Sequence, residues 1–591
     1  MSKGEGRSSG GPKRGIMQVD TSLRKKLQAR RGTLFAASAL VFFYFLALGR
    51  VPLLEPDEGR YTEIPREMLQ SGNWILPHLN GVRYFEKPPL YYWLNAASIN
   101  VFGLTPFASR FWSAAFGLLG LLVIYRLVRR SLSERTARLS VAILATSPLY
   151  LALARLTIID MTVSFFITVT LSCFFLAQDE TDRTRARWLW YGMFAAAALA
   201  VLSKGLIGIV LPGGVIGLYI LLTRQWRILP RVPWITGGGL FLLIALPWHL
   251  MAAMRDSGFL WFYFVHEHFL RFLTPISDRQ EPFWFFVPVI AWALLPWTAF
   301  LPAAAATFWR GSRSRGLLRL EPGLPLYLWL WAGVIFLFFS SSNSKLIPYI
   351  LPAIPPLAVL AACEVDGLLG GTASSRRWTK VQVGIAVLAM VLFGSAFLAA
   401  GLGAVKAFSP PGEVFPMVVL SAALTILLSC YALGLAARGR WPRAVASMIL
   451  CACALFACVW SAAPVIERAR STRKMAAFLK SNMKPGDRLI AYRYYPQTLP
   501  VYLERTISVA AFTGEQTYGV SRLSKAEREE RFPDAKGFKA VWDSPVRVYC
   551  VMDKDSQKYL QRDGIDHLYP IIKERQVLLA TNQPWDSGEG R

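Results

Sequence analysis

The stretch from Thr33 to Leu48, TLFAASALVFFYFLAL, contains no charged residue and directly follows a basic tail. A membrane helix needs about 20 apolar residues, and a shorter run is sufficient where long flanking side chains reach the interface. Nine Lys and Arg residues lie between Lys3 and Arg31, a bias typical of a cytoplasmic segment. The stretch therefore predicts a first membrane span, preceded by a basic cytoplasmic tail at residues 1–31.

Similar apolar runs recur along the next four hundred residues. Twelve follow the first: 107–125, 139–153, 157–177, 189–202, 206–222, 234–251, 283–308, 325–339, 347–362, 381–400, 415–435 and 445–460. Thirteen runs predict a polytopic α-helical membrane protein, with a transmembrane domain over residues 32–463.

The composition excludes other classes of protein. Hydrophobic residues make up 54% of the chain and charged residues 17%, so a disordered or fibrous protein is excluded. A formal net charge of +28 suggests nucleic acid as a partner, yet 20 Trp, 37 Phe and the apolar runs do not fit such a binder. In a membrane protein, the basic excess should instead be distributed asymmetrically between the two faces.

The loop charges support this count and set an orientation. With the N-terminus in the cytoplasm, every second connection should be basic. Such connections carry Arg126 to Arg138, Arg183 to Arg187, Arg224 to Arg231, Arg310 to Arg319, Arg376 to Lys380, and Arg438 to Arg443. An odd number of spans then places the C-terminus on the extracytoplasmic side.

Beyond residue 463 the sequence is typical of a soluble domain. An amphipathic helix is expected over 473–482, a strand over 488–492, a second strand over 546–552 and a helix over 555–562, which ends before Gly564. Alternating helices and strands predict a small α/β domain at 464–581, followed by a disordered tail at 582–591.

The connection after the first span, at about 50–106, is long and acidic. It begins Glu55-Pro56-Asp57-Glu58-Gly59-Arg60-Tyr61 and continues through Tyr84-Phe85-Glu86-Lys87. Three carboxylates within four residues, on the extracytoplasmic side, favour a site over a merely solvated loop. The neighbouring Trp and Tyr residues suit helices that lie in the membrane interface.

A further acid, Asp160, lies just inside the fourth apolar run. An ionisable group at membrane depth requires a partner or a polar cavity. Arg155 and Lys204 lie at the same face, so Asp160 is either half of a structural ion pair or a second acid of a site. Several cations near an acid-lined cavity could hold a phosphate, and Lys345 adds another. Because the chain has neither a Walker loop nor a dinucleotide fingerprint, an activated donor is expected to arrive through the lipid.

Taken together, these motifs resemble the bacterial 4-amino-4-deoxy-L-arabinose lipid A transferases. That family belongs to the polyprenyl-phosphate-dependent glycosyltransferases of the GT-C fold, which also include protein O-mannosyltransferases. The motifs that carry the resemblance are Glu55 to Tyr61, Glu86 to Trp93, Lys204-Gly205, Glu267-His268 with Arg271-Phe272, and Ser344-Lys345-Leu346. Ile347 stands where relatives usually have proline, and Pro348 follows it.

The resemblance implies an enzyme that moves aminoarabinose from undecaprenyl phosphate to a lipid A phosphate. This reaction takes place at the periplasmic face of the inner membrane and confers resistance to polymyxin and other cationic antimicrobial peptides. The family match implies that Asp57 and Asp160 are catalytic acids. It places the carrier phosphate at Arg60, Tyr84, Lys87, Lys204, Arg271, Lys345 and Tyr349. From the residues themselves we further expect a divalent metal at Glu86 and His268, no nucleotide cofactor, no nucleic-acid partner and a monomeric enzyme.

Other functions stay open at this point. A protein O-mannosyltransferase, or transfer of another sugar to an envelope acceptor, would use the same kind of site. A transporter is disfavoured because the ionisable groups lie at one face and not at the midplane of broken helices. A membrane scaffold would not need Asp160 or Lys204 at membrane depth.

Overall fold

A computed structural model describes residues 34–274, 279–313, 322–371, 376–401, 415–461, 467, 470–574 and 576–585. By internal contacts the chain divides into two units, Met1–Leu46 and Ala47–Arg591. The described part of the first unit is a short apolar helix, Leu34–Phe45. The predicted basic tail at residues 1–31 lies outside the described residues.

Within the described residues, nine helices are long and apolar enough to cross a membrane, or ten if a bent pair counts as one span. The chain is thus a multi-pass membrane protein. The nine are Pro106–Ser131 (α4), Ile159–Ala177 (within α7, Ile159–Gln178), Arg183–Lys204 (α8), Trp234–Arg255 (α10), Leu324–Ser341 (α14), Ile347–Leu369 (η5 Ile347–Ala353 with α15 Ile354–Leu369), Lys380–Ala399 (within α16, Arg376–Gly401), Phe415–Ala437 (α17) and Trp441–Trp460 (within α18, Trp441–Ser461). The bent pair joins Phe283–Ala293 (η3 and α12) to Trp297–Arg310 (η4 and α13) at 109°.

The predicted count of thirteen spans is not confirmed. The apolar helix Ile207–Thr223 (α9) is short, and the predicted span 139–153 is divided into α5 (Glu134–Ala145) and α6 (Pro148–Leu153). At the break, the Ser147 hydroxyl donates to the Ile143 carbonyl at 2.7 Å and Pro148 has no N–H with which to continue the helix. Hydropathy registers the whole apolar stretch, whereas the backbone is interrupted by one Ser-Pro step.

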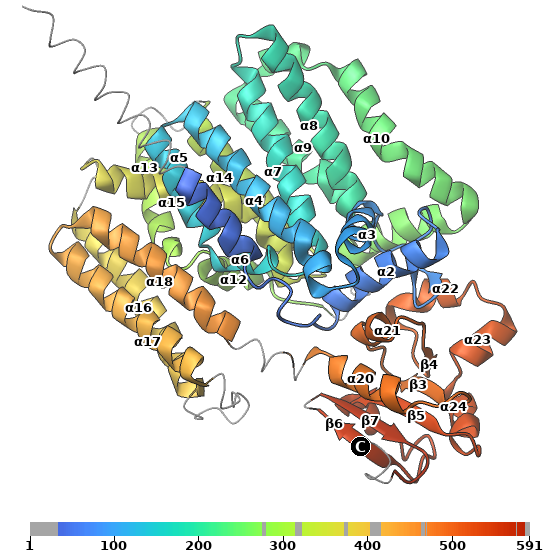
Figure 1. The fold of residues 1–591 in the computed structure, drawn as a ribbon. Coiled ribbons are helices and arrows are strands. Elements are labelled where there is room, and N and C mark those ends of the chain that lie inside the picture. The colour runs from blue at the N-terminus through green and yellow to red at the C-terminus, as the bar shows by residue number, and fades with distance from the viewer. Residues whose placement is uncertain are drawn as a thin grey trace, which may run out of the picture. The chain divides into compact units, whose positions relative to one another are not determined.

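Helices α7 and α8 run antiparallel. The residues predicted for the extracytoplasmic face therefore lie at one end of this helix pair, and those predicted for the cytoplasmic face lie at the other. Asp160 lies in the first turn of α7 and Lys204 in the last turn of α8, and the two side chains form an ion pair. The basic segment Arg183 to Arg187 begins α8 at the other end of this pair. The arrangement in Figure 1 therefore separates the basic loop from the acidic site as the charge pattern predicts.

The long connection after the first apolar helix is folded around two helices. It contains α2 (Asp57–Ser71), a hairpin of β1 (His78–Leu79) and β2 (Val82–Arg83), and α3 (Leu90–Phe102). Further on, η1 (Trp226–Arg231), η2 (Trp261–Leu270) and α11 (Arg271–Leu273) complete the connections around α10.

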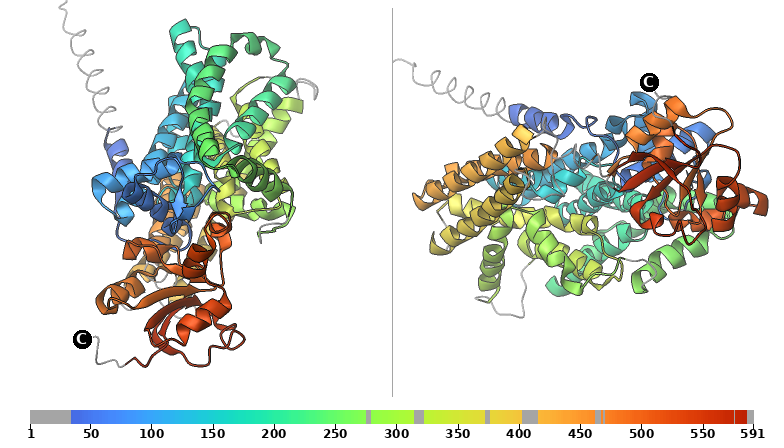
Figure 2. Two further views of the ribbon diagram at one scale, coloured as in Figure 1. Left: turned by 90° about the vertical axis from the view of Figure 1, so that its right-hand side faces the viewer. Right: turned by 90° about the horizontal axis from the view of Figure 1, so that it is seen from below.

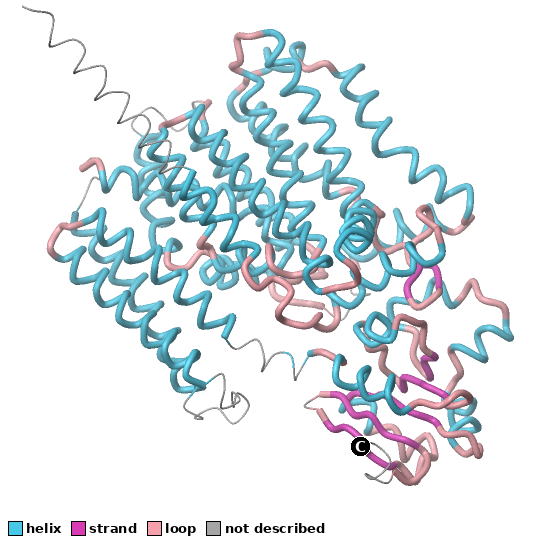
Figure 3. The backbone as a smooth tube through the Cα atoms, viewed as in Figure 1, coloured by secondary structure: helices cyan, strands magenta, loops and turns pink. Residues whose placement is uncertain are grey.

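The C-terminal domain is a five-stranded sheet with helices, in the order β4-β3-β5-β7-β6 (Figure 3). Strand β3 (Arg488–Tyr492) is parallel to β4 (Ser508–Ala510) and to β5 (Val548–Asp553), whereas β7 (Val577–Thr581) is antiparallel to β5 and β6 (Tyr569–Lys573). Its helices are α20 (Arg473–Asn482), α21 (Thr498–Leu503), η6 (Gly514–Gln516), α22 (Thr517–Val520), α23 (Lys525–Arg531), α24 (Ala535–Trp542) and α25 (Lys554–Gln557). Its core contains Tyr492, Phe538, Trp542 and Met552.

The α/β prediction is confirmed, with two corrections. The helix expected over 555–562 ends at Gln557, after one turn that Asp553 caps, and the chain continues in turns up to Gly564. The tail does not begin at residue 582. The Asn582 side chain is buried and donates to the Trp542 and Val546 carbonyls at 2.8 and 2.9 Å, and the Trp585 ring packs on Phe478.

Helix α2 packs against α21 of the C-terminal domain. In both views of Figure 2 the blue segment that contains α2 lies beside the orange and red C-terminal domain. Gly59 makes this approach possible, because a Cβ atom there would lie 2.5 Å from the Gln497 carbonyl carbon and 2.6 Å from the Thr498 nitrogen. Both of these atoms belong to the backbone and cannot swing away as a side chain could.

We expect Gly59→Ala to push α2 and α21 apart and to destabilise the protein by about 1–3 kcal/mol, as overpacking does. The thermal unfolding midpoint in detergent should fall. Gly217→Ala is the matched control, because it also lies in a helix but its Cβ would meet nothing within 4 Å. Equal midpoints for the two variants would contradict the close approach.

Candidate active site

The three carboxylates at the start of the long connection, Glu55, Asp57 and Glu58, make different contacts. Glu58 is buried and forms an ion pair of 2.6 Å with Arg110 of α4, and Glu55 accepts hydrogen bonds from Thr498 and Gln497. Asp57 remains, with 46% of its side chain exposed and the Arg60 Nη1 atom 3.4 Å from its Oδ1. Of the three, Asp57 is therefore the acid that stays half exposed, beside a residue of its own helix.

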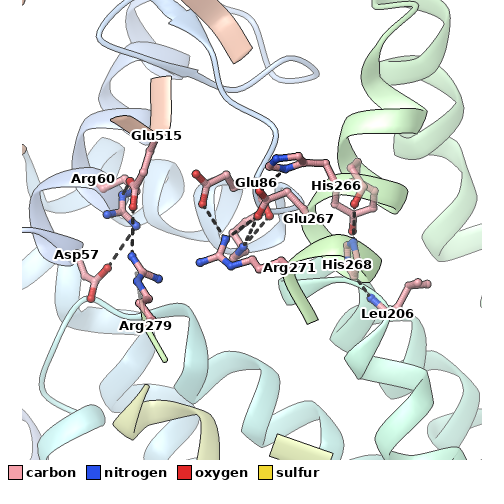
Figure 4. A network of polar contacts seen from close by, with 12 residues as sticks. Asp57, Arg60, Glu86, Leu206, His266, Glu267, His268, Arg271, Arg279 and Glu515 are labelled. Atoms are coloured by element: carbon pink, nitrogen blue, oxygen red, sulfur yellow. Dashed lines mark hydrogen bonds and ion pairs between the residues drawn. The ribbon is translucent and has the colours of Figure 1, made fainter. Parts of the chain in front are cut away.

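Arg60 connects Asp57 to the C-terminal domain, as Figure 4 shows. It lies three residues after Asp57 in α2 and therefore on the same face of the helix. Its Nε atom is 2.7 Å from Glu515 Oε2, and Arg279 Nη2 is 3.6 Å from Glu515 Oε1. Burial raises the pKa of Glu515 to about 7, although the Arg60 charge opposes this shift. A carboxylate is thus placed between two guanidinium groups.

A second cluster joins Glu86 to the segment around Glu267 (Figure 4), and Lys87 lies beside it. Arg271 Nη1 lies 2.7 Å from Glu267 Oε2 and 3.3 Å from Glu86 Oε2, and Lys87 Nζ lies 3.7 Å from Glu267 Oε2. Burial lowers the pKa of Lys87, and the charge of Arg271 adds to this effect. The structure therefore brings together Lys87 and Arg271, two of the five cations that the family resemblance places at the carrier phosphate.

The Asp160–Lys204 ion pair adjoins this second cluster through Tyr349. The Lys204 ammonium lies over the Tyr349 ring, 4.4 Å from its centroid. The charge interaction with Tyr349 also raises the pKa values of Lys87 and Arg271, in opposition to burial, which lowers them. Asp160 is thus ion-paired and lies within the same region as the other predicted residues.

Two tyrosines of the first connection link these groups. Burial raises the pKa of Tyr61 well above its usual value, and both Asp57 and Asp160 act in the same direction. Burial likewise raises the pKa of Tyr84, which Glu86 raises further and Arg60 opposes. The Tyr84 hydroxyl has no hydrogen-bond partner among the described residues, so it is available to a ligand between the two clusters.

Lys345 is placed differently from the other predicted cations. Its Nζ atom donates to the main-chain carbonyls of Ser342 and Glu281, at 2.6 and 2.8 Å. In this conformation the ammonium holds the chain around residue 281 and forms no ion pair with the carboxylates of the two clusters.

The predicted metal ligands do not fit a metal site as they stand. Glu86 pairs with Arg271 (Figure 4), and the described residues contain no group of three or more His, Cys, Asp or Glu side chains suited to a metal. His268 Nδ1 donates to the Tyr263 carbonyl at 2.6 Å, while its Nε2 accepts from the Leu206 N–H at 3.2 Å. Burial lowers the pKa of His268 to about 4, although the hydrogen bond to the Tyr263 carbonyl opposes this shift. The divalent metal stays a prediction, and metal analysis of wild-type protein against Glu86→Ala tests it.

Three residues that contact the predicted set were not predicted as site residues. Glu267 belongs to a quoted motif, but its contact with Lys87 and Arg271 depends on the fold of the segment around η2. Arg279 and Glu515 lie in segments without a motif, and no sequence signal points to them. Glu515 reaches Arg60 because the C-terminal domain packs against α2, and Arg279 joins them through its contact with Glu515.

Comparisons with known proteins match both parts of the chain. The family model of the dolichyl-phosphate-mannose-protein mannosyltransferases matches residues 33–264, and the model of the aminoarabinose transferase C-terminal domain matches residues 475–581. An undecaprenyl phosphate-alpha-4-amino-4-deoxy-L-arabinose arabinosyl transferase of Pseudomonas aeruginosa is 30% identical over 88% of this chain and 93% of its own. For the protein of the same name from Edwardsiella ictaluri, identity is 33% over 60% of this chain and 64% of the relative's length.

A solved structure extends the similarity to the fold. It is that of ArnT from Cupriavidus metallidurans bound to undecaprenyl phosphate, with a TM-score of 0.78 and 28% sequence identity. The alignment covers 93% of this chain and 98% of that protein. Both the membrane helices and the C-terminal domain are therefore included.

Proposed function

This chain belongs to the family of undecaprenyl phosphate-aminoarabinose arabinosyl transferases, and from that membership we propose that it transfers 4-amino-4-deoxy-L-arabinose from undecaprenyl phosphate to a phosphate of lipid A. One observation carries the proposal. Lys87 and Arg271 lie together on the same carboxylate, at the end of the molecule where Asp57 and Asp160 also lie. The related structure from Cupriavidus metallidurans was solved with the lipid phosphate that such cations would hold.

The reaction requires a phosphate to leave and a phosphate to attack. An oxygen of the acceptor phosphate forms a bond to C1 of the sugar, while the bond from C1 to the carrier phosphate breaks and its electron pair stays on that phosphate. Lys87 and Arg271 stabilise the charge that develops on the leaving group. The acceptor phosphate is already ionised near neutral pH, so no general base is needed to remove a proton.

Asp57 then acts in another way. A half-exposed carboxylate beside Arg60 suits either the ammonium of the aminosugar or the orientation of the acceptor. Asp160 forms an ion pair with Lys204 and so holds the Lys204 ammonium over the Tyr349 ring. It therefore serves as a positioning residue.

We expect Asp57→Asn to lower kcat/KM for transfer to lipid A by about 100-fold, the scale of losing one well-placed charged group at a reacting centre. Transfer would be measured with purified protein in liposomes that contain donor and lipid A. Asp566→Asn is the control, because Asp566 is an exposed acid of the C-terminal domain. Full transfer by Asp57→Asn would remove Asp57 from the site.

The proposed location is the inner membrane, with the site and the C-terminal domain on the periplasmic side. The distribution of basic residues over alternate loops supports this orientation. Labelling of single cysteines in intact cells, at exposed positions of the C-terminal domain, tests it directly.

The function itself is tested by mass spectrometry of lipid A from cells with and without the protein. An added aminoarabinose mass that depends on the protein is expected. Unchanged lipid A together with mannosylated protein would favour the protein O-mannosyltransferases, whose family model matches residues 33–264. The match of residues 475–581 to the aminoarabinose transferase C-terminal domain supports the first outcome.

A further inference from the structure

A cavity of about 340 Å³ lies where the C-terminal domain meets the beginning of α2. Residues after β3 and β4, and Asp553 at the end of β5, line it together with Pro56 and Arg60. Strand β3 lies between β4 and β5 and is parallel to both, so the chain leaves β3 in one direction for β4 and then crosses back to β5. In sheets of this kind, ligands bind outside the carboxyl ends of the strands at such a switch point.

Two buried amides in the lining lack partners for their polar atoms. Gln516 is 1% exposed, and neither its Oε1 nor its Nε2 atom has a hydrogen-bond partner among the described residues. The Oε1 atom of Gln497, in a side chain that is 7% exposed, is also unpaired there. Buried polar groups are rarely left unsatisfied, because each costs free energy, so these amides point to a ligand that donates and accepts hydrogen bonds.

Arginines give the cavity an affinity for anions. Arg60, Arg279 and Arg470 line it, and a third of the Arg279 side chain is exposed. The acids of the lining already have partners: Glu55 accepts from Thr498, Asp553 accepts from the Ser556 N–H at 2.7 Å, and Glu574 forms an ion pair with Lys474 at 3.8 Å. Glu515 is shared between Arg60 and Arg279, and the 3.6 Å contact with Arg279 is long enough to be exchanged for a phosphate.

The cavity also offers a surface for a sugar ring. Tyr494 and Phe512 belong to the lining, and Phe512 is 40% exposed. Aromatic faces pack against the C–H face of a pyranose while amides bind its hydroxyls. A volume of about 340 Å³ is at the lower end for ligand pockets and suits one phosphorylated sugar unit, not a whole glycolipid.

We propose that this cavity binds the phosphorylated sugar headgroup of the acceptor lipid and sets the choice of acceptor. The proposal rests on the proposed function and assigns the acceptor to the C-terminal domain, with Gln497 and Gln516 on the sugar and Arg279 on its phosphate. The carrier phosphate of the donor has its own cations, Lys87 and Arg271. Arg60 lines the cavity and contacts Asp57 at 3.4 Å, so it joins the acceptor headgroup to the reacting centre.

The test is direct binding to the full-length protein in lipid nanodiscs, without turnover. The probes are lipid A with its phosphates, the same lipid A after removal of the phosphates, and undecaprenyl phosphate. The variants are Gln516→Leu, which replaces the unpaired amide by an apolar side chain, and Arg279→Gln. Gln561→Leu is the matched control, because Gln561 is exposed and does not line the cavity.

We expect each of the two variants to raise the Kd for phosphorylated lipid A about tenfold, the scale of one lost hydrogen bond to a charged or buried partner. Undecaprenyl phosphate should bind as it does to wild type. Arg279→Gln should make no difference to lipid A without phosphates, whereas Gln516→Leu should still weaken its binding. Gln516→Leu should not lower the thermal unfolding midpoint, since the amide it removes has no partner in the described residues.

Unchanged lipid A affinity in both variants would overturn the proposal and leave the proposed function standing, provided that wild type still modifies lipid A. An equal loss of undecaprenyl phosphate binding would also overturn it, because the cavity would then belong to the donor. If wild-type protein binds undecaprenyl phosphate but not lipid A, the acceptor in the proposed function is wrong and this inference is wrong with it. Should Gln516→Leu fail to fold, Arg279→Gln still tests the proposal, because its affinity for lipid A with phosphates is compared with its affinity for lipid A without them.

Discussion

Charge reversal at Lys87 is expected to weaken the binding of undecaprenyl phosphate at least about 100-fold and to abolish transfer. Losing a charged partner in a desolvated site costs about 2–5 kcal/mol. The ammonium is largely buried, 3.7 Å from Glu267 and close to Arg271, so its charge is poorly screened by water. Affinity is measured by competition with labelled undecaprenyl phosphate.

Two further variants separate a binding effect from a folding effect. Lys87→Met removes the charge without adding a third acid beside Glu86 and Glu267, and it should still lose most of the affinity. Lys536→Glu reverses an exposed lysine of the C-terminal domain and should bind as wild type does. Wild-type affinity in Lys87→Glu would exclude Lys87 from the phosphate site.

The second large effect is expected at Arg110, which should be needed for folding. Its guanidinium is 1% exposed and donates to both Glu58 oxygens and to the carbonyls of Leu48, Val51 and Pro52. Removing one partner of a buried ion pair typically costs about 3–5 kcal/mol. We expect Arg110→Met to lower the thermal midpoint sharply and to reduce the yield of folded protein in detergent.

Because Glu58 becomes an unpaired buried charge in Arg110→Met, the double variant Arg110→Met/Glu58→Leu should be less unstable than the single one. Arg129→Met, on the same helix but 62% exposed at its arginine, is the control and should change the midpoint little. A midpoint for Arg110→Met equal to that of the control would contradict the structural role.

The sequence predicts the membrane helices well because their signal is local. A long apolar run without charge rarely forms anything other than a membrane span. The basic loops predict on which side of the membrane each connection lies. The failure at 139–153 arises from Ser147-Pro148, where the composition stays apolar but the backbone hydrogen bonding is interrupted. Hydropathy does not register such a break.

The site is predicted only in part, and the missing part is tertiary. Glu55, Asp57 and Glu58 look equivalent in the sequence, yet Glu55 precedes α2, and Asp57 and Glu58 are successive residues of that helix, whose side chains point about 100° apart. One of them is therefore directed to the C-terminal domain, one to the site and one into the helix bundle. Lys87 and Arg271 could be grouped from motifs, whereas Glu515, Gln497 and Gln516 depend on a domain packing that no local pattern encodes.

The contact between Arg60 and Glu515 limits how freely the C-terminal domain could be exchanged between related proteins during evolution. Two family models match separate portions of this chain, that of the mannosyltransferases at residues 33–264 and that of the aminoarabinose transferase C-terminal domain at residues 475–581. Arg60 belongs to the first portion and its acid to the second, so the modules are not freely interchangeable. A chimaera that grafts a different C-terminal module onto residues 33–264 would leave the buried guanidinium of Arg60 with Asp57 alone as its counter-ion. The seam between the modules is thus a place where exchange during evolution requires a compensating acid.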